Sequence, residues 1–141
     1  YLMGNTSSVN KVNFEDVQAI QKKTIKGVMI NTLSGDFQSC LISGTLPISQ
    51  EEKIINELIT THPEVYIVVY GKNSNDETIY KKYSQLRDLG FLNVRVYIGG
   101  LFEWLMLQDI YGADDFSTTM NELDILKYKP QTTLSNSLVS Y

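Results

Sequence analysis

An apolar run from Val65 to Tyr70 that stops at Gly71 constrains the fold more than any other stretch of this sequence. The run is apolar at nearly every position, which is typical of a parallel strand covered on both faces of a sheet. Residues 72–77 are then polar or charged, and a helical pattern begins after them. A strand that leads through a loop into a helix places free backbone N–H groups and the positive end of the helix dipole at that loop. The loop at residues 71–78 is therefore where we expect any chemistry.

Helical and strand-like patterns alternate along the rest of the chain. Asn13 fits a helix N-cap, and Ser49 with Glu52 fits a capping box at the start of a later helix. The expected elements are helices at 14–20, at 51–61, from Ser74 or Asp76 to about 89, and at 101–111, strands at 27–32, 65–70 and 94–98, a loop at 33–45 and a short extended segment at 46–48. This order predicts an α/β fold of three layers, in which a mostly parallel central sheet of about five strands has helices on both faces.

The composition narrows the classes of function. A chain of 141 residues has the length of one domain. Its net charge of −4 argues against nucleic acid as its main partner, since neutralising phosphates needs a basic face. One cysteine, Cys40, and one histidine, His62, exclude an internal disulfide and a structural zinc site, and we expect no metal or cofactor. The lone cysteine and the lack of a long apolar run indicate a cytoplasmic protein.

The polarity of the sequence predicts three regions. A flexible leader at residues 1–12 precedes the folded domain at 13–112, and a polar extension follows at 113–141. The extension is expected to be a loose tail, a wrapping strap or an interaction segment.

The N-terminal leader carries a candidate lipidation site. Tyr1 and Leu2 are expected to be left from an expression vector, which makes Met3 the native start. Residues 3–8 then fit the N-myristoylation pattern with Gly4 as the acylated residue, although they also fit a polar, disordered leader. A single acyl chain would give weak, reversible membrane association.

Several short motifs follow one another within residues 13–112. They are Met29-Ile30-Asn31 at the end of a strand, Leu41 to Ile48 in the following loop, Ile67 to Tyr70 before the polar loop, Leu86 to Val94 with Gly90-Phe91 inside it, and Gly99-Gly100 followed by Trp104. In this order they resemble the rhodanese-like domain family, which includes sulfurtransferases and the related cell-cycle dual-specificity phosphatases. The resemblance implies the three-layer fold predicted above.

The family's active-site loop is changed in this chain. The catalytic cysteine of the family directly follows the strand that ends here at Tyr70, and Gly71 stands in that position. The family's loop ends in an arginine that helps to hold the anion, whereas Asp76, Glu77 or Thr78 occupies that end here. Sulfur transfer and phosphatase chemistry both need a thiolate, which a glycine cannot supply.

The leading hypothesis is therefore a catalytically inactive rhodanese-like domain that binds a protein partner and has a regulatory role. The degenerate active-site loop consists of Gly71, Lys72, Asn73, Ser74, Asn75, Asp76, Glu77 and Thr78, and its residues 71–76, all expected to be exposed, would be the recognition surface. The alternative is a sulfurtransferase or phosphatase-like enzyme that uses Cys40 as a relocated thiol. A third hypothesis, compatible with the first, is a membrane-peripheral adaptor acylated at Gly4.

Overall fold

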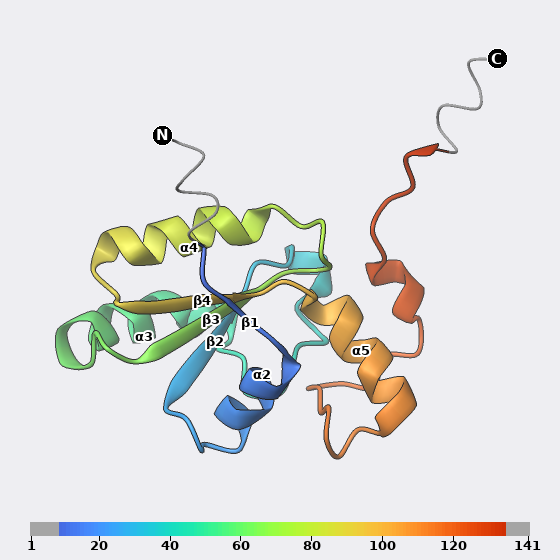
Figure 1. Ribbon diagram of the computed structural model, residues 1–141, viewed down its shortest axis with the longest axis horizontal. Helices are drawn as coiled ribbons and strands as arrows, with labels where there is room; N and C mark the ends of the chain where they lie inside the picture. The colour runs from blue at the N-terminus through green and yellow to red at the C-terminus, as the bar shows by residue number, and fades with distance from the viewer. Residues whose placement is uncertain (1–8, 135–141) are drawn as a thin grey trace.

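The computed structural model describes residues 9–134, and within this range four parallel strands form a sheet in the order β1–β4–β3–β2 (Figure 1). The elements in chain order are β1 (Lys11–Val12), α2 (Phe14–Gln21), β2 (Gly27–Asn31), the 3₁₀ helix η1 (Gly35–Phe37), α3 (Ile48–Thr61), β3 (Tyr66–Tyr70), α4 (Thr78–Leu89), β4 (Asn93–Tyr97), α5 (Gly100–Tyr111) and the 3₁₀ helix η2 (Ile125–Tyr128). The predicted α/β fold with a parallel sheet is confirmed.

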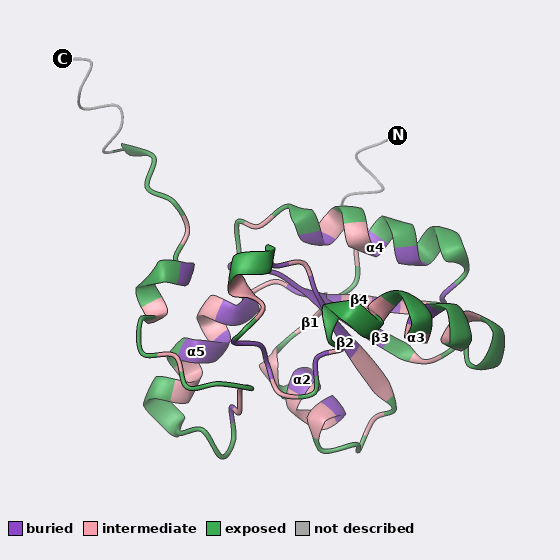
Figure 2. Ribbon diagram, turned by 180° about the vertical axis from the view of Figure 1, so that it is seen from behind, coloured by how far each residue is buried: buried purple, intermediate pink, exposed green. Residues whose placement is uncertain are grey.

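The central strand β3 supplies side chains to two separate hydrophobic cores. Ile67 and Val69 pack with residues of α3 and α4, whereas Val68 and Tyr70 pack with residues of α2 and α5. This alternation follows from the two-residue period of a strand. In Figure 2 the strands are largely buried, whereas α3 and α4 are exposed over most of their outer surfaces. The sheet is thus the middle of three layers, as predicted.

The segment before α3 differs from the prediction. Instead of adding a fifth strand, it forms an isolated bridge between Thr45 and Met29, and the Leu46 N–H donates to the Met29 carbonyl at 2.9 Å. Pro47 then takes the N-cap position of α3, which begins at Ile48. Because proline lacks an N–H and holds φ near −65°, it ends the strand pairing and starts the helix. The expected capping box of Ser49 and Glu52 is therefore wrong, since both residues lie inside the helix.

The segments on either side of the predicted domain pack onto it. Lys11 and Val12, which the sequence analysis assigns to the flexible leader, form β1 and pair with β4. Asn13 caps α2 as predicted, through a capping box with Asp16. None of the helices between residues 9 and 134 has the length and apolar character that a membrane span requires. Gly4 and residues 135–141 lie outside the described residues.

Part of the predicted C-terminal extension also belongs to the folded core. Phe116 and Tyr128 are buried in the core on the α2 and α5 side of the sheet. The indole Nε1 of Trp104 donates to the Ser117 carbonyl at 3.1 Å. Residues 113–128 therefore form a strap across the domain, which is one of the three forms expected for this region.

Tyr70 brings a hydroxyl group into the core at the end of β3. Its oxygen accepts the Ile42 N–H at 3.1 Å and lies 2.7 Å from the hydroxyl oxygen of Thr45. Burial raises the pKa of this phenol well above its ordinary value. The contacts tie the loop before α3 to the strand that leads into residues 71–78.

Replacing Tyr70 by Phe is expected to lower the free energy of unfolding by about 1–3 kcal/mol, because the Ile42 N–H and the Thr45 hydroxyl lose a buried partner. Urea unfolding followed by circular dichroism measures the change. Tyr66→Phe on the same strand is the matched control, since Tyr66 is 39% exposed. The control should stay within about 0.5 kcal/mol of wild type. Equal losses in the two variants would contradict the assigned role of the Tyr70 hydroxyl.

Candidate functional site

The loop at residues 71–78 lies at the carboxyl edge of the sheet. Asn31, Tyr70 and Tyr97 are in register across β2, β3 and β4, so the loops that follow the three strands leave the sheet side by side. Open parallel sheets bind ligands at this edge. The predicted succession of buried strand, polar loop and helix is therefore confirmed, and it places residues 71–78 beside the loops that begin at Thr32 and Ile98.

The carboxylate of Asp76 turns into its own loop. Oδ2 accepts the Lys72 N–H at 2.8 Å, and Oδ1 accepts the Thr78 N–H at 3.0 Å. The Thr78 hydroxyl also donates to Oδ1 at 2.5 Å. An anion can bind to a loop of this kind through its backbone N–H groups. Here the chain's own carboxylate takes two of them, as an internal anion.

Gly71 faces this carboxylate directly. A Cβ atom added to Gly71 would lie 2.4 Å from Asp76 Oδ2, 2.8 Å from Asp76 Cγ and 3.0 Å from the Thr32 hydroxyl oxygen. The φ angle of Gly71 is not positive, so the obstacle to a larger residue is the space and not the backbone. With Asp76 in its present place, no side chain fits at position 71.

The start of the loop is fixed to the N-terminus of α5. The Leu101 N–H donates to the Gly71 carbonyl at 3.0 Å, and the Phe102 N–H donates to the Lys72 carbonyl at 2.9 Å. Gly100 makes this approach possible, because it has a φ of +65° and a Cβ there would lie 2.7 Å from the Gly71 carbonyl oxygen. The first free N–H groups of α5 are thus used to hold the loop.

The prediction that residues 71–76 are all exposed is wrong. Asn73 is buried, and its Nδ2 donates to the carbonyl of Tyr128 at 2.9 Å, which ties the loop to the strap. Lys72 is half-buried, with its ammonium group 4.4 Å from the ring centroid of Phe37. The side chains that remain exposed are those of Ser74, Asn75, Glu77 and Thr78.

An open groove of about 540 Å³ runs beside the loop. It lies between residues 32–37, residues 72–78 and residues 129–133, which follow the strap. Its polar groups include Lys72, Asp76 and Lys129. In the range 9–134 no group of three His, Cys, Asp or Glu side chains is arranged to hold a metal ion.

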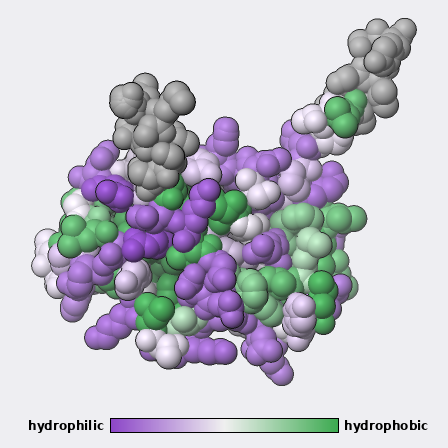
Figure 3. All heavy atoms as spheres, in the orientation of Figure 1, coloured by the Kyte–Doolittle hydropathy of each residue, from purple (hydrophilic) through white to green (hydrophobic). Residues whose placement is uncertain are grey.

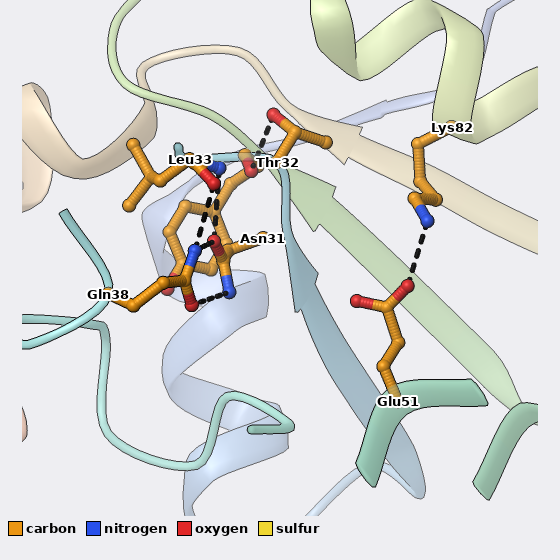
Figure 4. A network of polar contacts seen from close by, with 7 residues as sticks. Asn31, Thr32, Leu33, Gln38, Glu51 and Lys82 are labelled. Atoms are coloured by element: carbon orange, nitrogen blue, oxygen red, sulfur yellow. Dashed lines mark hydrogen bonds and ion pairs between the residues drawn. The ribbon is translucent and has the colours of Figure 1, made fainter. Parts of the chain in front are cut away.

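Asn31 organises the loop on the other side of this groove. Its Oδ1 accepts the Leu33 N–H at 3.0 Å and the Gln38 Nε2 at 2.7 Å, and its Nδ2 donates to Gln38 Oε1 at 3.2 Å. Figure 4 shows the two amides facing each other, with the ion pair of Lys82 and Glu51, 2.8 Å long, on the neighbouring side. Sequence reasoning missed the role of Gln38, because an isolated glutamine in a loop carries no pattern.

Cys40 lies in the core and does not line the groove. It is 1% exposed, and its Sγ donates to the Met120 carbonyl at 3.4 Å. Burial raises the pKa of the thiol above its ordinary value. A reactive cysteine needs the opposite conditions, which are access to solvent and a lowered pKa.

A protein-family model described as Rhodanese-like domain matches residues 31–107, which is more than half of the chain. The chain belongs to the rhodanese-like domain family. The match runs from the end of β2 into α5 and contains the whole loop at 71–78. β1, α2 and the strap lie outside it and still pack onto the rhodanese-like sheet.

Several solved structures share the fold. The BH2092 protein from Bacillus halodurans has a TM-score of 0.58 at 16% identity, over 98% of this chain and 96% of that one. Thiosulfate sulfurtransferase from Pseudomonas aeruginosa has a TM-score of 0.57 at 16% identity, over 90% of this chain and 25% of that one. The Alr3790 protein from Anabaena sp. has a TM-score of 0.54 at 16% identity, over 84% of this chain and 100% of that one. No curated protein matches the sequence significantly.

Substituting Gly71 by Ala is expected to lower the free energy of unfolding by about 1–3 kcal/mol, because the new Cβ displaces the Asp76 carboxylate from its N–H donors. In an Asp76→Ala background the same change should cost at least about 1 kcal/mol less. Urea unfolding of the four proteins of this cycle measures the coupling. Gly35→Ala is the control, since a Cβ at Gly35 meets nothing within 4 Å. Additive losses at Gly71 and Asp76 would contradict the contact.

Proposed function

We propose that this rhodanese-like domain is catalytically inactive and works as a binding and regulatory module, with the loop from Gly71 to Thr78 as its recognition surface for a protein partner. The observation that carries the proposal is the Asp76 carboxylate, which fills the space beside Gly71 and binds the Lys72 N–H. The resemblance to the family puts the catalytic cysteine at Gly71.

The chemistry of the family supports the absence of activity. A persulfide or a phosphocysteine forms on a thiolate, and Gly71 has no side chain that could carry either group. A thiosulfate or phosphate anion approaching the loop would meet the negative charge of Asp76. Lys72, the basic residue of the loop, has its ammonium group over the ring of Phe37.

The rigidity of the loop supports a role in recognition. Asp76 and Asn73 hold its interior, the N-terminus of α5 holds its start, and the strap holds Asn73. The exposed side chains of Ser74, Asn75 and Glu77 are thus presented from a fixed backbone. Polar loops on a rigid scaffold are common recognition elements, since little conformational entropy is lost on binding.

Two further hypotheses concern the Cys40 thiol and acylation at Gly4. An enzyme that uses Cys40 would need the thiol to leave the core, and burial of Cys40 with its raised pKa supports a structural role instead. Acylation at Gly4, with the membrane association that it implies, falls outside the described residues. A cytoplasmic location is likewise a prediction from the composition.

The protein is expected to show no turnover above background with thiosulfate and cyanide, or with an aryl phosphate. Thiocyanate formation and phenol release measure the two activities, with the Pseudomonas aeruginosa thiosulfate sulfurtransferase as the positive control for the first assay. Cys40→Ala should behave like wild type. Turnover that persists in Cys40→Ala would contradict the proposal that the domain is inactive. Turnover that Cys40→Ala abolishes would instead support an enzyme that uses the Cys40 thiol.

A photo-crosslinking side chain at Asn75 is expected to capture a discrete protein partner in cells that express the chain, because Asn75 is an exposed residue of the loop. The same side chain at Asn56, which is exposed on the outer surface of α3, is the matched control. Gel electrophoresis and mass spectrometry compare the adducts. Identical adducts at the two positions, or none at Asn75, would count against the loop as the recognition surface.

A further inference from the structure

Helix α5 carries apolar side chains on its outer side as well as on its inner side. Leu101, Trp104 and Leu105 are buried against the sheet. The outer side should be polar on an ordinary amphipathic helix, but Met106 is 45% exposed and Ile110 is 66% exposed. The segment with η2 packs against part of this outer side, and Met106 and Ile110 stay exposed beside it.

The segment before and within η2 extends this apolar surface. Leu123 is 85% exposed and Leu126 is 64% exposed. Together with α5 they line a groove of about 440 Å³, which we call the α5 groove and which is formed by Phe102, Met106, Asp109, Ile110, Leu123, Asp124, Ile125 and Leu126. Figure 3 shows hydrophobic residues gathered on the right of the molecule, over α5 and η2. Exposed apolar side chains that gather in one place mark an interaction site more often than single ones do.

The surroundings of the α5 groove are acidic. No Lys or Arg occurs between Arg95 and Lys127, while the same stretch contains six carboxylates: Glu103, Asp109, Asp114, Asp115, Glu122 and Asp124. Glu103 accepts a hydrogen bond from the Tyr97 hydroxyl, and Glu122 forms an ion pair with Lys127. Asp109 and Asp124 line the α5 groove itself, and among residues 9–134 neither belongs to an ion pair. Lys127, which follows Leu126 in the chain, acts electrostatically on Asp124, so Asp109 is the carboxylate of the groove that no basic side chain compensates within the described residues.

We propose that the α5 groove is the docking site for an amphipathic helix of another protein whose apolar side chains are flanked by Lys or Arg. The apolar floor would bury the hydrophobic side of such a helix, and Asp109 and Asp124 would select its basic flank. The 12 residues of α5 match a partner helix of about three turns. This site is separate from the loop at 71–78, and the inference does not depend on the proposed function.

The charge also argues against two other occupants. In a symmetric dimer through this face, the carboxylates of one copy would lie opposite those of the other, which is unfavourable. An anionic membrane surface would be repelled by the same groups. A basic partner gains from both the apolar floor and the charge.

The test uses the full chain and two synthetic helical peptides with the same leucine pattern, one with Lys and one with Glu at the flanking positions. Fluorescence anisotropy of the labelled peptides measures the dissociation constants. The Lys peptide should bind at least about tenfold more tightly than the Glu peptide, and its affinity should fall as salt is raised. Ile110→Gln and Leu126→Gln should each weaken its binding about tenfold. Ile110 and Leu126, like the positions of the control variants below, are exposed, so the variants should fold.

Matched controls separate the α5 groove from the rest of the surface. Leu92→Gln removes a leucine that is 69% exposed outside the groove and should leave the affinity unchanged. Asp109→Asn should weaken binding and reduce its salt dependence, whereas Asp88→Asn on α4 should do neither.

Three results would overturn the proposal. The first is binding of the Lys peptide that Ile110→Gln leaves unchanged, which would indicate unspecific charge attraction. The second is a dimer in sedimentation experiments that Ile110→Gln dissociates, since a second copy would then be the occupant. The third is binding to vesicles of phosphatidylserine that the same substitution abolishes, since lipid would then be the occupant.

Discussion

Strand β3 is hydrogen-bonded to β2 on one side and to β4 on the other, and its side chains alternate between the two cores. A five-residue strand in this position has no freedom to shift, because a slip of one residue would exchange the side chains of the two cores. The end of β3 is thereby fixed, and with it the point at which the chain leaves the sheet at Gly71. The geometry of the loop therefore follows from how β3 packs between the two helical layers.

The loop keeps the backbone N–H groups of an anion site, but these groups bind a carboxylate of the protein itself. Backbone N–H groups at the end of a parallel strand favour a negative charge, whether that charge belongs to a ligand or to the protein. In this chain Asp76 provides the charge and Gly71 provides the room for it. The two residues are therefore best understood as one unit. If position 76 held a small residue beside Gly71, the backbone N–H groups of the loop would lose their internal anion. If position 71 held a cysteine beside Asp76, the cysteine Cβ would clash with the carboxylate.

The parts of the structure that could be predicted are those with a local pattern. The run from Val65 to Tyr70 indicated the buried strand, and Asn13 indicated a helix start, because both signals lie within a few residues. Lys11 and Val12 could not be identified as a strand, since two residues show no period. The burial of Asn73 depends on the Tyr128 carbonyl, 55 residues further along the chain, and no local pattern reports such a contact.

The strap gives the domain a physical boundary that differs from its evolutionary one. The family match ends at residue 107, yet Phe116 and Tyr128 complete the core beneath α5, with the ring centroid of Phe116 lying 5.1 Å from that of Trp104. A fragment cut at the family boundary would expose the indole of Trp104 and the thiol of Cys40 together with the apolar side chains around them. A fragment that keeps this core complete therefore includes the strap through Tyr128, and the boundaries of an excised domain should follow the core and not the family match.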